Sequence, residues 1–294
     1  MGVSPTSFHE GKVLMKVRKS NIIVFLLLII SASLLLYPTV SNLWNSMHQT
    51  SAVGSYITKT EDLSEEINQQ LIIQAQEYNK TLVGQNLDRF ILDKDKETEY
   101  NQLLKLEGTD IMAIVDIPKV NVRLPIYHGT DEAILQIAIG HIFGTSLPVG
   151  GTGTHSVISG HTGLTSSKLF TDIEKLEEGD IFNITTLGHK MTYQVDKITV
   201  VLPTELDDIA IDPNEDYVTL QTCTPYGVNT HRLLVRGHRI DNQSENRQIS
   251  ADAVEVSPII SNAVLVVIIL AIRLMIKLIV WIFEKLLDNK QTKE

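Results

Sequence analysis

Two long apolar runs stand out in the hydrophobic and polar pattern of this 294-residue chain. The first is Asn21 to Val40, and the second runs from Ile259 to Phe283. Each approaches the roughly 20 apolar residues that cross a bilayer core of about 30 Å. The pattern therefore predicts two transmembrane helices, at 21–40 and 258–283, on either side of a larger polar region.

The charges beside the first run predict its orientation. Four Lys or Arg residues precede it, against the single acidic residue Glu10. Because cytoplasmic flanks are enriched in Lys and Arg, we expect a cytoplasmic basic tail at 1–20 and an extracellular chain after Val40. A cleavable signal peptide is the alternative, but the run is long for one, and no small-x-small cleavage site follows it.

The second run is expected to return the chain to the cytoplasm, leaving a short tail at 284–294. Arg273 and Lys277 lie four positions apart and so share one helix face. They lie about 21 and 27 Å beyond Ile259 along a helix, where their side chains can reach the inner headgroups. An amphipathic helix lying on the membrane is the alternative. The predicted localisation is the cell membrane, with two passes and the catalytic region on the extracellular face.

Between the two runs, the pattern changes from helical to strand-like. Residues 41–108 are expected to be a helical region, because the stretch 62–76 is rich in helix formers and lacks Gly and Pro. Residues 109–241 contain short apolar runs separated by Gly, Pro, Asn and Asp, which predict strands. The expected strands are 111–117, 120–127, 155–159, 181–185, 191–203, 217–223 and 232–240, with short helices near 131–139 and 169–176. Seven or eight such strands predict a mainly β fold, a small closed barrel, followed by a polar linker at 242–257.

Charge and composition narrow the possible partners. The formal net charge is −10, and no basic stripe is present, so a nucleic-acid partner is not expected. The acidic runs at 61–66 and 93–99 are predicted to be solvated faces rather than calcium sites, and the second lacks the Gly of an EF-hand loop. The sequence therefore predicts no metal and no cofactor.

Cys223 is the only cysteine, so no intramolecular disulfide is possible. A lone thiol on an exported domain is an oxidation liability unless it has a use. Period-two alternation in 217–223 puts Cys223 at a strand end, on the more polar face. A turn then leads to a strand that opens with Arg232, so antiparallel pairing is expected to bring the two together. A guanidinium favours thiolate and can bind an anionic oxygen, whereas the alternative is an inert Cys and a solvated Arg.

A cysteine nucleophile also needs an acid or base, usually a histidine. His161 is the strongest candidate of the nine histidines, because it follows an apolar strand and stands in Ser159-Gly-His-Thr-Gly163, a loop where a side chain can face a cleft. His9 is expected inside the cell and His48 next to the membrane. His231 and His238 lie on the Arg232 strand itself.

The run Thr219-Leu-Gln-Thr-Cys223, with Arg232 nine positions on and Ser159-Gly-His161 before it, resembles the sortase signature. The runs 144–151 and 222–235 resemble the class C, pilus-assembling sortases, as do Leu169-Phe170 and Gly179-Asp180. The resemblance covers roughly residues 109–241. It implies an eight-stranded sortase-type β-barrel and a thiol transpeptidase.

Carried over to this chain, the resemblance implies Cys223 as nucleophile, His161 as the general acid/base, and Arg232 as the group that holds substrate and stabilises the oxyanion. It implies pilin subunits as partners, cut after Thr in a Leu-Pro-x-Thr-Gly (LPxTG-like) sorting motif and joined to a lysine amine of a neighbouring pilin. Three alternatives stay open: a cysteine hydrolase, a cell-wall-anchoring sortase, and a non-catalytic barrel of the cell envelope.

Many class C sortases carry a lid with Asp-Pro and an aromatic residue ahead of the barrel. The nearest match here is Asp88-Arg89-Phe90. The resemblance implies that Asp88 pairs with Arg232 and that Phe90 covers Cys223. Because Arg89 replaces the proline, we expect a less rigid and loosely closed lid. The alternative is a surface loop with an ordinary core Phe.

Overall fold

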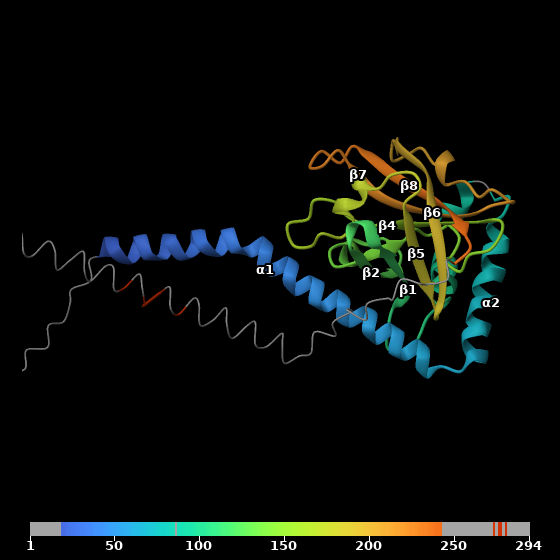
Figure 1. Cartoon of the computed structure of the whole chain (residues 1–294), viewed down its shortest axis with the longest axis horizontal. Helices are drawn as coiled ribbons and strands as arrows, with labels where there is room; N and C mark the ends of the chain where they lie inside the picture. Colours follow the sequence, from blue (N-terminus) through green and yellow to red (C-terminus); the bar gives the residue numbers. More distant parts are fainter. Residues whose placement is uncertain (1–18, 86, 243–272, 274–275, 278–279, 281–294) are drawn as a thin grey trace, which may run out of the picture.

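The computed structural model describes residues 19–85 and 87–242, together with the isolated positions 273, 276, 277 and 280. A long helix, α1 (Lys19–Asp62), leads into a domain built on a β-barrel, and α2 (Glu65–Leu82) packs along the side of that domain (Figure 1). The predicted second span, 258–283, lies outside the described residues apart from those four positions.

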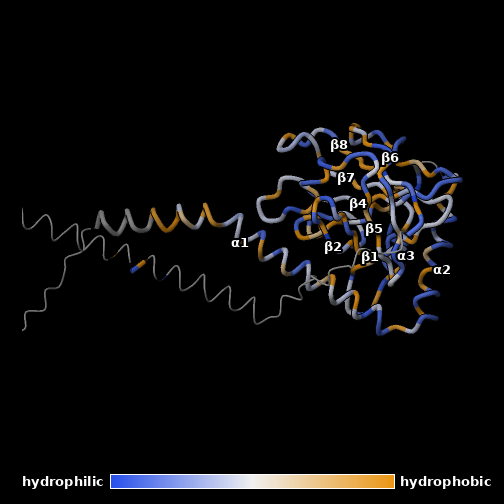
Figure 2. The backbone as a smooth tube through the Cα atoms, viewed as in Figure 1, coloured by the Kyte–Doolittle hydropathy of each residue, from blue (hydrophilic) through white to orange (hydrophobic). Residues whose placement is uncertain are grey.

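α1 joins the predicted anchor to the predicted helical region without a break. It continues through Pro38 and carries no Lys, Arg, Asp or Glu between Leu27 and Thr58. Its segment Leu27–Asp62 is long and apolar enough to cross a membrane. The apolar end of α1 extends away from the domain (Figure 2), with side chains such as Leu35 exposed. One membrane-spanning helix is therefore supported by length and composition.

The other end of α1 is built into the domain. Val53 and Tyr56 are buried in the main core. The Tyr56 hydroxyl donates to the Met112 carbonyl (2.8 Å) and accepts from the Leu187 N–H (2.9 Å). Burial raises the pKa of Tyr56 to about 12, so the hydroxyl keeps its proton. α1 is thus fixed to the barrel by a buried aromatic side chain that bonds to two strands' ends.

Three shorter helices follow before the barrel. α2 begins at the N-cap Ser64, and its buried Asn79 exchanges two hydrogen bonds with the Leu147 backbone (3.0 and 2.7 Å). The 3₁₀ helix η1 (Leu87–Phe90) and α3 (Lys94–Tyr100) come next. The acidic run 93–99 forms α3, because the Asp93 carboxylate caps its first turn and acidic residues are favoured at helix N-termini.

The barrel is closed by eight strands in the order β1-β2-β3-β4-β7-β8-β6-β5. The strands are β1 (Ile111–Ile117), β2 (Val122–His128), β3 (Ile139–His141), β4 (Thr154–Ser159), β5 (Ile181–Thr186), β6 (His189–Val201), β7 (Asp216–Thr224) and β8 (His231–Ile240). All neighbouring pairs are antiparallel except β2–β3 and β4–β7. The predicted eight-stranded barrel is confirmed.

Seven of the strands lie where the pattern predicted them, and β3 was missed. β3 has three residues, of which Gly140 carries no side chain, so it has no readable alternation. The two short helices expected nearby are α4 (Glu132–Leu135) and the 3₁₀ helix η3 (Thr171–Lys175). A third and a fourth 3₁₀ turn, η2 (Pro118–Val120) and η4 (Asp207–Ile209), lie in connections.

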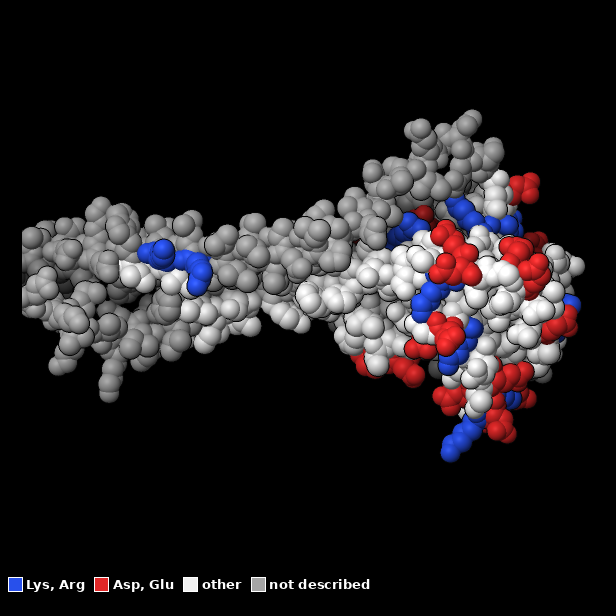
Figure 3. Space-filling view, turned by 90° about the horizontal axis from the view of Figure 1, so that it is seen from below, with Lys and Arg blue, Asp and Glu red and all other residues white. Residues whose placement is uncertain are grey.

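Apolar side chains of the barrel form two clusters. The large one fills the barrel interior, and its centre includes Ile126, Ile158 and Phe182. The small one consists of Val157, Ile209 and Leu234, with four partly buried residues packed on it. Acidic and basic side chains are interspersed over the domain on the face in Figure 3. The small cluster is the one that adjoins the candidate site.

Candidate active site

Cys223 and Arg232 lie directly opposite each other where β7 and β8 form an antiparallel pair. Residues paired in this way point to the same face of a sheet, with Cβ atoms about 4.5–5.5 Å apart. Both side chains are half-buried. The pairing brings a thiol and a guanidinium side by side at one end of the barrel, as the strand pattern predicted.

His161 reaches the same end because β4 and β7 are parallel. Ser159 pairs with Gln221 in the last rung, so His161 and Cys223 each lie two residues beyond it. The Gly160 N–H continues the pairing by donating to the Gln221 carbonyl (3.0 Å). Parallel neighbouring strands end at the same edge of a sheet. This topology therefore brings the imidazole and the thiol to one edge although they are far apart in the sequence.

Gly160 allows β4 to end against the barrel so closely. A Cβ atom at this position would lie 2.7 Å from Ile139 Cγ2 and 2.8 Å from the Phe170 ring. The Gly160 carbonyl accepts a hydrogen bond from the Thr222 hydroxyl (2.7 Å), which is buried beside Cys223. A larger residue would displace the backbone immediately before His161.

The His161 imidazole has an unused nitrogen. Its side chain is 26% exposed, but Nε2 is buried and has no hydrogen-bond partner among the described residues. The Glu132 Oε2 atom lies 3.8 Å from Nε2, beyond hydrogen-bond reach. Nε2 is thus not committed to a hydrogen bond within the described fold. An imidazole of this kind can give and take a proton.

Glu132 has a carboxylate close to the His161 ring, and the sequence analysis missed it. It stands in the first turn of α4, and its side chain is 73% exposed. Nothing in the sequence separates it from an ordinary surface acid, because only the barrel topology brings α4 to His161. Exposed ion pairs contribute little to stability, so Glu132 acts at most as a weak orienting group.

Arg232 keeps most of its donors free. Its Nη1 donates to the carbonyls of Asn229 (3.3 Å) and His231 (3.1 Å) in its own turn. Within the described part of the chain, no carboxylate lies within ion-pair distance of it. A guanidinium has five N–H donors. The remaining donors can therefore bind an oxygen of a substrate.

An apolar patch adjoins these three side chains on the same face of the sheet. Two-residue alternation puts Leu234 on the face of Arg232, and the strand register puts Val157 there too. Ile209, from the connection between β6 and β7, completes the cluster. The face therefore carries polar groups at its end and a buried apolar cluster beside them.

The β6–β7 connection is bonded firmly over this patch. Lys197 and Thr199 bind the Asp208 carboxylate, and the Lys197 bond is the main cause that lowers the pKa of Asp208. The His155 ring contacts the Ala210 carbonyl (2.8 Å) one residue beyond the end of η4. The connection beside the cluster is thus held both within η4 and directly after it.

The segment Asp88-Arg89-Phe90, which was predicted to be a lid, also lies on this face. Phe90 is half-buried and packs against the small cluster of Val157, Ile209 and Leu234. Arg89 is 7% exposed, its Nη2 donates to the Ile209 carbonyl (3.2 Å), and its guanidinium lies 4.7 Å from the Phe90 ring centroid. Burial lowers the pKa of Arg89.

Two expectations about that segment differ from the structure. Asp88 is exposed and makes no ion pair with Arg232 within the described residues, so the expected partner of the guanidinium is absent. Arg89 was expected to add backbone freedom, but its buried side chain fixes η1 to the β6–β7 connection. The segment is therefore held by a side-chain contact in place of the stiffness that a proline would give.

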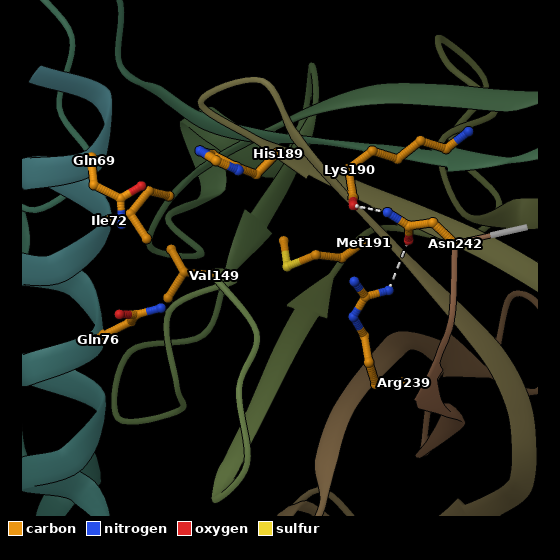
Figure 4. A pocket seen from close by; sticks show the side chains of 9 residues that line it. All are labelled: Gln69, Ile72, Gln76, Val149, His189, Lys190, Met191, Arg239 and Asn242. Atoms are coloured by element: carbon orange, nitrogen blue, oxygen red, sulfur yellow. Dashed lines mark hydrogen bonds between the residues drawn. The ribbon is translucent and has the colours of Figure 1, made fainter. Parts of the chain in front are cut away.

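A cavity of about 370 Å³ lies elsewhere, between α2 and the far end of β6 and β8. Figure 4 shows Gln69 and Gln76 of α2 facing Met191 and Arg239 across it. Arg239 is seven residues along β8 from Arg232, about 23 Å at strand spacing. The cavity is therefore separate from the candidate site. No group of three or more His, Cys, Asp or Glu side chains between 19 and 242, as far as described, is arranged to hold a metal.

Similarity to known proteins agrees with this geometry. A sequence model of the sortase domain matches residues 115–240. The solved structure of sortase C1 from Streptococcus agalactiae is 45% identical, with a TM-score of 0.62, and the match covers 65% of this chain and 99% of that one.

Two further solved structures are similar over almost their full length. Sortase A from Corynebacterium diphtheriae, a lid mutant, is 42% identical with a TM-score of 0.59, covering 62% of this chain and 98% of that one. Sortase C from Streptococcus pneumoniae, whose structure concerns catalysis and pilin substrate specificity, is 39% identical with a TM-score of 0.59, covering 65% and 97%.

Proposed function

The chain belongs to the sortase family, cysteine transpeptidases that act on surface proteins, and we propose that Cys223, His161 and Arg232 are its catalytic residues. One observation carries this assignment. The parallel β4–β7 pair and the antiparallel β7–β8 pair end at one edge, where a thiol, an open imidazole nitrogen and a guanidinium with free donors converge.

In the first step, the sulfur of Cys223 attacks the carbonyl carbon of a peptide bond, and the thiol proton passes to His161. The carbonyl oxygen becomes an oxyanion, which the free N–H groups of Arg232 stabilise. The intermediate collapses when the C–N bond breaks, and the Nε2 proton of His161 moves to the departing amine. The product is a thioester on Cys223 and a free amine.

In the second step, an acceptor amine attacks the thioester and gives its proton to His161. The C–S bond breaks, the thiol of Cys223 is restored, and a new amide is formed. A thioester retains the acylating power of the original bond, so an amine can compete with water as the acceptor. The enzyme therefore exchanges one amide for another without an external energy source.

The substrate in this proposal is a Leu-Pro-x-Thr-Gly-like sorting motif of a pilin, cut after Thr, and the acceptor is a lysine amine of the next pilin. Two solved neighbours are sortases C, and one of them is described for its pilin substrate specificity. The apolar patch beside Cys223 suits a substrate with apolar residues ahead of the scissile bond. Attachment to a cell-wall precursor is the second candidate, since it uses the same chemistry with another amine.

A lid over the site is part of the proposal. Phe90 covers the apolar patch, and Arg89 holds the segment to the β6–β7 connection through the Ile209 carbonyl. Substrate can bind this patch only after Phe90 has left it. Asp88 is exposed and serves as the hydrophilic end of the segment rather than as the partner of Arg232.

The proposed topology places the domain outside the cell, with both ends of the chain in the cytoplasm. The uncharged segment of α1 and the basic residues that precede it support the first crossing. A tag after Glu294 is expected to resist protease added to intact cells. Digestion of that tag would contradict the second crossing.

The chemistry is tested by trapping the chain with a sorting-motif peptide and locating the adduct by mass spectrometry. We expect an acyl group on Cys223 that disappears when an amine is added, with formation of the ligated peptide. Release of free acid alone, even with excess amine, would indicate a cysteine hydrolase. An unmodified Cys223 would contradict the assignment, and lysine-bearing pilin against cell-wall peptide as acceptor distinguishes the two transpeptidase roles.

A further inference from the structure

The loop that carries His161 is bonded within itself near the ring, where the His161 carbonyl accepts from the Phe170 N–H (3.1 Å) and the Gly163 N–H donates to the Thr171 hydroxyl (3.1 Å). It runs from the end of β4 to η3 and contains no strand or helix. For residues 164–168, the backbone hydrogen bonds described are those with two asparagines of α1 and one from the Thr171 N–H to the Lys168 carbonyl. The position of residues 164–168 therefore depends largely on α1.

A row of polar side chains on α1 provides that support. Asn42 Oδ1 accepts from the Lys168 N–H (3.1 Å), and Asn45 Nδ2 donates to the Ser166 carbonyl (3.0 Å). Residues three and four apart share one face of a helix, so Gln49 continues the same row. All three side chains are half-buried against the domain.

Gln49 connects this loop to a second one. Its Nε2 donates to the Ser167 hydroxyl (3.1 Å) and to the Ile137 carbonyl (2.7 Å). Ile137 follows α4, the helix that contains Glu132. A single amide thus bonds to both segments that meet at the His161 imidazole, one carrying the ring and the other the carboxylate 3.8 Å from its Nε2.

We infer that Asn42, Asn45 and Gln49 are positioning residues of the transpeptidase, which set the place of His161 relative to Cys223. This inference rests on the proposed catalytic role of His161. The row begins two residues after the predicted end of the membrane span at Val40, about 3 Å along the helix axis. The exposed Trp44 lies in the same turn, as is common for aromatic residues at the membrane surface. The helix that anchors the enzyme thereby also orients its acid/base.

Opposite bonding roles of the two asparagines allow a matched test. Asn42 accepts and Asn45 donates, so Asn42→Asp keeps its bond whereas Asn45→Asp removes the donor and puts a carboxylate against a carbonyl. The two substitutions have the same size and charge and lie three residues apart on one helix. Gln49→Glu removes both donor bonds of Gln49 in the same way.

The full chain is assayed in lipid nanodiscs with a sorting-motif peptide and an amine acceptor. The rate of transpeptidation is expressed per reactive thiol, which is counted by titration with iodoacetamide. We expect Asn45→Asp and Gln49→Glu to lower kcat about tenfold at unchanged KM, as for a small misplacement of a catalytic group, while Asn42→Asp stays within about twofold of the parent. Thermal midpoints identify any variant that is unfolded, and Asn45→Ala then replaces Asn45→Asp with the same expected loss.

An unchanged kcat in Asn45→Asp would overturn the inference. Equal losses of kcat in Asn42→Asp and Asn45→Asp would also overturn it, because they would reflect the added charge alone. A rise of KM at constant kcat would also overturn it. Cys223→Ala and His161→Ala are run in parallel. If these retain turnover, the proposed function itself fails. If they are inactive and Asn45→Asp is normal, only the positioning role fails.

Discussion

Two regions of the barrel hold histidines in opposite states. His141 and His155 are buried, and both nitrogens of each ring have partners: the hydroxyl of Tyr100 and the carbonyl of Ser146 for His141, and the Ala210 carbonyl and the Thr219 hydroxyl for His155. Just beyond the end of β4, the Nε2 of His161 is buried without a hydrogen-bond partner among the described residues. The same side chain is thus hydrogen-bonded through both nitrogens in one region and open at Nε2 in the other, where we propose that it carries the proton.

This difference separates the histidines that stabilise the fold from the one that is available for chemistry. Burial lowers the pKa of both His141 and His155 to about 4, so these rings are neutral at physiological pH and serve as fixed donors and acceptors. His161 is not committed to the fold in that way. Removing a saturated histidine should therefore affect folding, whereas removing the open one should affect turnover.

The largest expected effect is on catalysis. His161→Ala should lower kcat/KM for peptide cleavage by about 10³-fold or more, because acid/base groups that act with a nucleophile are not replaced by water. The free energy of unfolding should stay within about 0.5 kcal/mol of the parent, as for surface changes. His238→Ala, on the half-exposed end of β8, is the control and should retain activity. A severely unfolded His161→Ala would contradict the distinction.

The next effect is on stability. His141→Ala leaves a cavity and removes partners from the Tyr100 hydroxyl and the Ser146 carbonyl, so it should cost about 3 kcal/mol of unfolding free energy. Urea unfolding measures this loss. The rate per folded molecule should be unchanged. A stable but inactive His141→Ala variant would mean that this ring takes part in catalysis.

Acid should lower the stability of the fold through the same two buried histidines, His141 and His155. Their folded pKa values of about 4 lie below the ordinary value of 6.5, so the unfolded state binds more protons between pH 6.5 and 4. Stability must then fall as the pH falls through this window, by about 3 kcal/mol for each ring at most. His155→Gln keeps a neutral donor and acceptor and should flatten the dependence by about one proton. An identical slope in parent and variant would contradict the buried neutral state.

The smallest expected effect concerns the lid. Arg89→Met removes the bond to the Ile209 carbonyl but keeps apolar bulk, so Cys223 should react with a small thiol reagent about threefold to tenfold faster. Asp88→Ala should leave the rate unchanged, because Asp88 is exposed and unpaired within the described residues. Combined replacement of Asp88 and Phe90 by Ala should also accelerate labelling. Equal rates in all variants would show that this segment does not restrict access.

Much of the architecture was readable from the sequence, because local patterns determine local structure. The period-two runs predict seven of the eight strands, and the apolar run at 21–40 predicts the exposed part of α1. Cys223 and Arg232 are close in sequence across a turn, so their pairing on β7 and β8 follows from hairpin geometry. The pairing of Cys223 with Arg232 was therefore predictable without any tertiary information.

Other features depend on contacts between distant segments, which a local pattern does not encode. The parallel pairing of β4 and β7 brings His161 to Cys223, and the packing of α1 brings its polar row to the loop after His161. Glu132 looks like any surface acid, and Arg89 looks like a solvated charge, until the closed barrel puts one beside an imidazole and buries the other. Residue type and spacing determined which groups could react, and only the tertiary structure decided which of them meet, because side chains interact through space and not along the chain.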